Sequence, residues 1–182
     1  MKFSFHRGSL ALDFVGTVGQ RASQSKEERL TGGQDLRDWL REAGLPAPAQ
    51  VSEADLALAR ELREAIDQLG TQTLDGKPLG RAPLAVLNAA AAGTAEGAAR
   101  LDARGRREFV ARFPLRFSLA RIAEDAIERL SSDAERLTRC KLPGCGALLM
   151  SRSRSDPRRW CSMESCGNRA KVAAFRKRLR RQ

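Results

Sequence analysis

The sequence lacks an uncharged run long enough to form a transmembrane helix, which needs about 20 apolar residues. Its longest uncharged run, Ala82–Ala95, is rich in alanine, includes Asn88 and is typical of a helix in a soluble protein. A secretion signal is also missing, because Asp13 interrupts the apolar stretch Gly8–Gly19 near the N-terminus. We therefore expect a cytoplasmic protein without a membrane partner.

The sequence is also poor in groups that catalyse reactions. It has one histidine, His6, and no partner for a catalytic base is evident near it. A glycine-rich phosphate loop before a helix, a Ser/His/Asp set and the nucleobase-deaminase pattern are all absent from the sequence. Asp13 is either a hydrogen-bonded structural carboxylate, which we favour, or part of a small-ligand pocket. We expect a protein that is not an enzyme and keep open a small-molecule effector in its N-terminal part.

Basic and acidic residues are distributed unevenly along the chain. Residues 1–138 contain 20 basic residues (Lys or Arg) and 20 acidic residues (Asp or Glu), whereas residues 139–182 contain 13 basic and 2 acidic residues. The net charge of +11 therefore lies entirely in the C-terminal part. Such asymmetry is typical of a protein in which one part meets a polyanion. We predict two domains, 1–138 and 139–182, with nucleic acid as the partner of the second.

All four cysteines lie in this basic part, in two pairs of equal spacing. Four residues separate Cys140 from Cys145, fifteen follow, and four residues separate Cys161 from Cys166. Two such pairs predict one structural Zn²⁺, held by four sulfur atoms at about 2.3 Å with no position left for a catalytic water. Disulfides would suit a secreted protein, a redox pair would usually be Cys-x-x-Cys, and unrelated buried thiols would not explain the paired spacing.

Apolar periodicity predicts an α+β fold with a helix-rich N-terminal domain and a small β element. Apolar residues recur at three- and four-residue steps over Leu56–Leu69, after a capping box at Ser52 and Asp55. Residues 9–18 fit either a buried strand or a short helix, and residues 20–28 a loop. The other predicted elements are helices over Gln34–Ala43, Leu84–Ala92 and Leu115–Leu137, and a β-hairpin over residues 98–113.

The C-terminal module is predicted to be a knuckle, a short strand and a helix. Its apolar residues are few, so metal ligation is expected to supply the stability that a small core does not. The expected order is a tight turn at Pro143-Gly144, a strand over Ala147–Met150, a basic loop over Ser151–Arg159 and a helix from near Ser165 to about Arg181. The helix has an apolar stripe, which we expect to pack onto the finger or the N-terminal domain: Val172, Phe175 and Leu179.

Basic residues of this module are the candidate nucleic-acid contacts, because Arg binds phosphate and can also bind a guanine edge through two hydrogen bonds. The candidates are Arg152, Arg154, Arg158, Arg159, Arg169, Lys171, Arg176, Lys177 and Arg180. Trp160 is expected to form a wall of the small core. Gly167 and Asn168 are expected to be turn residues or outer partners of the zinc ligands.

The segments around the cysteines resemble a known family. Arg159-Trp160-Cys161-Ser162-Met163 and Cys166-Gly167-Asn168-Arg169-Ala170-Lys171, with the pair Cys140 and Cys145, resemble the CGNR zinc finger. Leu12-Asp13-Phe14-Val15-Gly16-Thr17 resembles the opening of the ABATE domain that usually precedes this finger. The resemblance covers essentially the whole chain and implies a bacterial, stress-responsive transcription regulator with DNA as its target. It also implies that the four cysteines are the zinc ligands. The chain departs from the family at Leu148–Ser151, where an aromatic residue and an Asp or Asn are common.

The basic module leaves two other functions open. It could bind RNA or the ribosome, since a basic tail does not distinguish DNA from RNA. It could also be a protein-interaction finger whose arginines bind an acidic partner. Nothing in the sequence assigns an oligomeric state.

Overall fold

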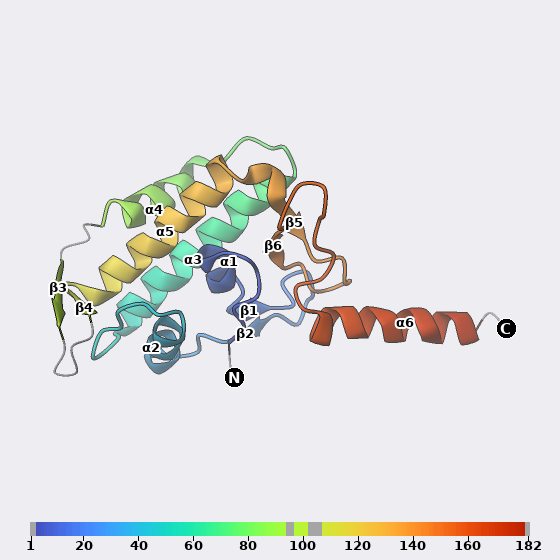
Figure 1. The fold of residues 1–182 in the computed structure, drawn as a ribbon, viewed down its shortest axis with the longest axis horizontal. Helices are drawn as coiled ribbons and strands as arrows, with labels where there is room; N and C mark the ends of the chain where they lie inside the picture. The colour runs from blue at the N-terminus through green and yellow to red at the C-terminus, as the bar shows by residue number, and fades with distance from the viewer. Residues whose placement is uncertain (1–2, 94–96, 102–106, 181–182) are drawn as a thin grey trace.

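The structure is a computed structural model that describes residues 3–93, 97–101 and 107–180 (Figure 1). Helices and short strands make an α+β fold, as predicted. The helices are α1 (Leu10–Val15), α2 (Gly33–Glu42), α3 (Glu53–Leu74), α4 (Arg81–Ala91), α5 (Pro114–Ser131) and α6 (Asn168–Leu179). The strands form three antiparallel pairs: β1 (Val18–Gly19) with β2 (Glu27–Glu28), β3 (Gly97–Leu101) with β4 (Arg107–Ala111), and β5 (Leu137–Arg139) with β6 (Leu148–Met150). None of the described helices is both long and apolar enough to cross a membrane.

Helices α3, α4 and α5 run alongside one another and carry most of the core (Figure 1). The predicted apolar face of α3 is buried, including Leu56, Leu62, Ile66 and Leu69. Trp39 of α2 is completely buried, and its ring lies 4.8 Å from the ring of Phe14 in α1, centroid to centroid. The two short N-terminal helices therefore close the core on the side opposite α4.

The helix starts follow from local hydrogen bonds. Ser52 Oγ accepts from the Asp55 N–H at 3.1 Å, while the Ser52 N–H donates to Asp55 Oδ2 at 3.0 Å, which confirms the capping box. Ser9 Oγ accepts from the Leu12 N–H at 3.2 Å. This cap decides the ambiguous segment over residues 9–18 in favour of a short helix, α1.

Several predicted boundaries were wrong. The helix predicted over Leu115–Leu137 ends at Ser131, where the Ser131 hydroxyl bonds back to the Ile127 carbonyl. A 3₁₀ turn follows at Ala134–Arg136, and Leu137 then pairs with Met150 as the start of β5. The loop predicted over residues 20–28 contains β2. The predicted hairpin is confirmed as β3–β4, and its turn lies outside the described residues.

The β5–β6 hairpin joins the cysteine-bearing segment to the helical part. Leu12 of α1 packs with Leu137, Leu148 and Met150 in one buried cluster. A Cβ atom on Gly70 of α3 would lie only 2.7 Å from Leu148 Cδ1, so helix and hairpin are in close contact. In contrast, α6 projects away from the rest of the molecule (Figure 1).

Candidate metal centre and basic surface

The four cysteine sulfur atoms converge on one point. All lie within 4.8 Å of one another, and three of the separations are 3.8 Å (Cys145 to Cys161), 3.6 Å (Cys145 to Cys166) and 3.1 Å (Cys161 to Cys166). Tetrahedral zinc with Zn–S bonds of about 2.3 Å requires sulfur atoms about 3.8 Å apart. The spacing and the all-sulfur donor set therefore fit one structural zinc ion, as predicted.

Two turns and two backbone hydrogen bonds assemble this cluster. Gly144 and Gly146 have φ values of +79° and +64°, which favour glycine, and they form the knuckle around Cys145. The Cys140 N–H donates to the Ala147 carbonyl at 2.9 Å and closes the knuckle. The Lys141 N–H donates to the Arg159 carbonyl at 2.9 Å, which brings the second cysteine pair beside the first.

Cys166 lies in a π-helical turn, Met163–Gly167, that leads directly into α6. The Ser162 hydroxyl accepts from the Ser165 N–H and begins the turn. The predicted helix over 165–181 is thus divided into this turn and α6. Asn168 Nδ2 donates to the Glu164 carbonyl at 3.1 Å, so this side chain fastens the turn. A Cβ atom on Gly167 would lie 2.8 Å from Met163 Sδ and 3.4 Å from Trp160 Cδ1, so the glycine allows close packing.

The cysteines are free thiols rather than disulfides, and they are largely buried. Trp160, Ala147 and Leu149 pack against them, so Trp160 is part of the small core as expected. Hydrogen bonding with the Cys161 thiol lowers the pKa of Cys145 to about 5, and the same contact raises the pKa of Cys161. Burial raises the pKa of Cys140. A bound Zn²⁺ would displace the remaining thiol protons and cross-link the two turns.

Cationic groups surround this centre. Arg169 Nη2 lies 3.5 Å from Cys166 Sγ. Arg7, from the N-terminal segment, lines a cavity of about 320 Å³ together with Cys145, Cys161 and Cys166. Burial lowers the pKa of Arg7, while the Cys161 thiol and the Asp13 carboxyl act to raise it. Arg7 was not predicted from the sequence, because no motif links this residue to cysteines that are more than 130 positions away.

The predicted nucleic-acid contacts lie on two adjoining segments, the Ser151–Arg159 loop and α6. In the loop, Arg152, Arg154 and Arg159 are exposed, while Arg158 is partly buried and donates to the Cys161 carbonyl at 3.1 Å. The Arg159 guanidinium lies over the Trp160 ring, 5.4 Å from its centroid. The remaining candidates are exposed on α6 or at its end: Arg169, Lys171, Arg176, Lys177 and Arg180.

The apolar stripe of α6 was predicted wrongly. Val172, Phe175 and Leu179 do not pack onto the finger or the N-terminal domain, because they are 48, 57 and 56% exposed. Of the described elements, α6 packs chiefly against the π-helical turn at its own N-terminus. The i, i+3, i+7 pattern indicates an apolar face but not whether another element covers it.

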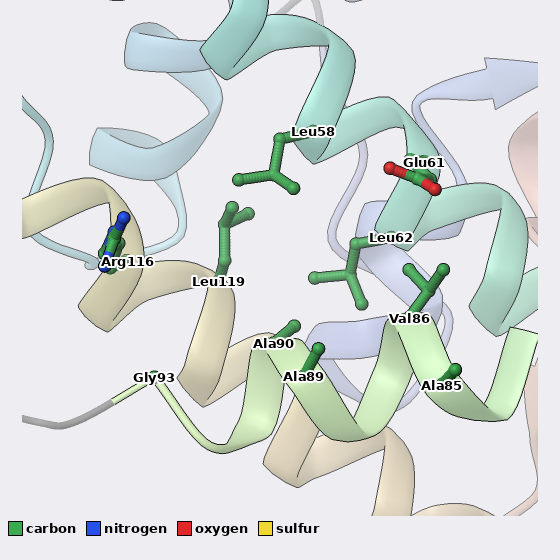
Figure 2. Close-up of a pocket in the computed structure, with 10 residues that line it drawn as sticks. All are labelled: Leu58, Glu61, Leu62, Ala85, Val86, Ala89, Ala90, Gly93, Arg116 and Leu119. Atoms are coloured by element: carbon green, nitrogen blue, oxygen red, sulfur yellow. The ribbon is translucent and has the colours of Figure 1, made fainter.

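Other hollows lie in the described part of the chain, and two of them are relevant to function. A polar cleft of about 490 Å³ separates the Ser151–Arg159 loop from the N-terminal segment, and it is lined by His6 and Arg136 as well as by Arg152, Asp156 and Arg158. An apolar groove of about 430 Å³ lies between α3, α4 and α5. Figure 2 shows Leu58, Leu62 and Leu119 reaching into this groove above the alanines of α4, with Glu61 and Arg116 on opposite sides.

Comparison with known families agrees with this geometry. The ABATE family, described as “Putative stress-induced transcription regulator”, matches residues 8–133. The CGNR zinc finger matches residues 136–179 and thus includes all four cysteines. No curated protein matches the sequence. The chain therefore belongs to the ABATE family and carries a CGNR zinc finger with one structural zinc site.

Proposed function

We propose that this protein is a bacterial transcription regulator that binds duplex DNA in a zinc-dependent manner and responds to stress in the cytoplasm. One observation carries the proposal: the cysteine-bearing turns connect the basic loop to the basic helix α6, and almost every candidate cation on these two segments is exposed. The family description supports a regulatory role. In this proposal zinc has a structural role and no catalytic role, because four thiolates fill the coordination shell of the ion.

Helix α6 favours DNA over RNA as the partner. None of its residues is buried, and five of its 12 residues are cations. The major groove of B-DNA is about 12 Å wide and admits an α-helix, whereas the major groove of A-form RNA is too narrow for side chains to read. A projecting basic helix therefore suits duplex DNA better than duplex RNA.

The polar cleft extends the proposed DNA surface onto the N-terminal segment. Three arginines and His6 line it against a single carboxylate, Asp156. Arg136 is held in place by a 2.9 Å ion pair with Asp133 and a 3.1 Å bond to the Ser151 carbonyl. We therefore include His6 and Arg136 among the phosphate contacts, although both precede the predicted C-terminal domain, residues 139–182.

A fluorescence-anisotropy titration of labelled duplex DNA over a series of salt concentrations tests the proposal. Contact with about five phosphates gives a slope of about −4 to −5 in log K against log salt. Replacing Arg152, Arg154 and Arg159 with Gln should make this slope shallower by about 3. The matched control replaces Arg41, Arg81 and Arg121 with Gln, because these exposed arginines lie on the helical part and the charge change is equal.

The same titration separates the alternative functions. Tighter binding to a structured RNA than to the duplex would favour an RNA-binding module. Absence of binding to either nucleic acid at low salt would favour a finger that recognises an acidic protein. A flat salt response, or equal effects of the two triple variants, would contradict the proposed surface.

The apolar groove is our proposed position for a small-molecule effector. Its volume of about 430 Å³ lies in the range of about 300–1,000 Å³ that is usual for ligand sites, and Arg116 offers one cation at its edge. A thermal-shift screen of amphipathic organic acids should find ligands that stabilise the wild type. Ala89→Trp, which fills the groove, should lose the shift, whereas Ala82→Trp outside the groove lining should keep it. Equal shifts for both variants would place the effector elsewhere.

A further inference from the structure

Arg7 links the helical part to the metal centre through its backbone. Its N–H donates to Asp13 Oδ1 of α1 at 2.7 Å, and its carbonyl accepts from the Met150 N–H of β6 at 2.8 Å. The residue is only 7% exposed. Its position is therefore fixed from both sides, by α1 and by the hairpin that leads to the cysteines.

The side chain of Arg7 is a buried cation in a space made for it. Gly16 leaves room for the guanidinium, because a Cβ atom at that position would overlap it. Arg7 Nε is buried and has no hydrogen-bond partner among the described residues. The Asp13 carboxyl lies near this cation, but a buried charge that is not fully hydrogen-bonded is costly, so further negative charge nearby would stabilise Arg7.

The cysteine cluster provides that charge when it holds zinc. Four thiolates with one Zn²⁺ carry a net charge of about −2. Arg169 approaches Cys166 from the side of the finger at 3.5 Å, and Arg7 lines the cavity onto which Cys145, Cys161 and Cys166 open. Arg29 also lines this cavity but forms an ion pair with Glu27 at 3.1 Å. Among the described residues that line this cavity, Arg7 and Arg169 are thus the arginines that form no ion pair with a carboxylate and are placed to balance the charge of the centre.

We propose that Arg7 is an outer-sphere counter-charge of the zinc–thiolate centre and that it couples zinc binding to the stability of α1. Zinc binding adds negative charge beside the buried guanidinium, whose other acidic neighbour is Asp13. Loss of zinc lowers the negative charge of the cysteine cluster, and the resulting destabilisation falls on the segment between Arg7 and Gly16. Partners in the outer shell of a metal site typically change metal affinity by about ten- to a hundredfold.

Competition with a chromogenic chelator on the purified full chain measures the effect on zinc affinity. Arg7→Met, which keeps an unbranched side chain but removes the charge, should weaken zinc binding by about ten- to a hundredfold. Gly16→Ala should weaken it in the same direction, because it displaces the guanidinium without removing it. Arg7→Lys should lie between Arg7→Met and the wild type. The matched control is Arg37→Met, since Arg37 on α2 also has a buried Nε without a partner but does not line the cysteine cavity.

Hydrogen–deuterium exchange on the unaltered protein gives a second measurement that does not depend on the folding of any variant. With zinc, the amides of Arg7, Met150 and α1 should exchange more slowly than without zinc. Unchanged exchange at these amides, or zinc affinity of Arg7→Met within threefold of the wild type, would overturn the proposal. Both measurements are made without nucleic acid, so their outcome is independent of the proposed DNA binding.

Discussion

Arg63 and Glu28 form a two-pronged ion pair that fastens β2 to α3. Arg63 Nη1 and Nη2 donate to the two carboxylate oxygens of Glu28 at 2.7 and 2.6 Å. The Arg63 side chain is 4% exposed, whereas that of Glu28 is 35% exposed. The guanidinium gains most from the pair, because it lies where water cannot solvate it.

Breaking this pair should destabilise the helical part. Glu28→Gln leaves a buried guanidinium short of one charged partner, and we expect it to lower the free energy of unfolding by about 2 kcal/mol. Urea denaturation followed by circular dichroism measures the loss. The control is Glu27→Gln, which removes a more exposed pair with Arg29 and should cost less than about 1 kcal/mol. Equal costs would show that the burial of Arg63 does not strengthen the pair.

Asp13 should make the folded state less stable as the pH rises, which is the opposite of the usual effect of a carboxyl group. Burial raises the pKa of Asp13 to about 6, although Arg7, His6 and Arg158 all face it and lower the pKa. The folded state therefore favours the protonated carboxyl. This contribution is fully present below the unfolded pKa of about 4 and is lost as the pH rises through about 6.

The substitution Asp13→Asn tests this directly. At pH 7 the variant should be more stable than the wild type, by up to about 3 kcal/mol, and the difference should vanish near pH 4. Unfolding curves of the two proteins at each pH, with equal zinc, give the difference. A variant that is less stable at pH 7 would show that the charged carboxylate is needed for its bond to the Arg7 N–H.

Loss of the metal should act mainly on the cysteine-bearing segment. Cys161→Ser removes one of the four sulfur atoms, and the small cluster around Trp160 is too small to hold the segment alone. We expect residues 140–180 to unfold and α2 to α5 to stay folded, with a Tm lowered by a few degrees because Leu12 loses its packing on the β5–β6 hairpin. Ser155→Ala, at an exposed loop position, is the control.

Thermal melts with and without a chelator, combined with limited proteolysis, measure both effects. A stable proteolytic fragment ending near residue 138 would support the predicted domain boundary, which stays a prediction. Complete unfolding of Cys161→Ser would show instead that the two parts fold as a single unit.

The exposure of the apolar stripe of α6 predicts that substitutions in the stripe leave the free energy of unfolding almost unchanged. Phe175→Gln should change the free energy of unfolding by less than about 0.5 kcal/mol, because the side chain is 57% exposed. Phe14→Ala, in the core, should cost about 3–5 kcal/mol in the same urea titration. A large cost for Phe175→Gln would restore the sequence interpretation, in which the stripe packs onto the finger or the N-terminal domain.

The sequence was most informative where a pattern is local. The spacing of Cys140, Cys145, Cys161 and Cys166 predicted the sulfur cluster, and the apolar period of α3 predicted its buried face. Strands of two or three residues, such as β1, β2 and β5, are too short to show alternation. Arg7 lies at the site only because of tertiary contacts. A local sequence pattern cannot predict that it neighbours cysteines so distant along the chain. The exposure of Phe175 likewise depends on where α6 points.

The direction of α6 is set at one end only, by the π-helical turn that contains Cys166. An isolated helix of 12 residues is marginally stable in water. Release of zinc would therefore destabilise α6 itself as well as the turn before it. The cations of α6 would then no longer be aligned on one helix or held in a fixed orientation relative to the basic loop. The concentration of available zinc would then determine whether the protein can bind a polyanion.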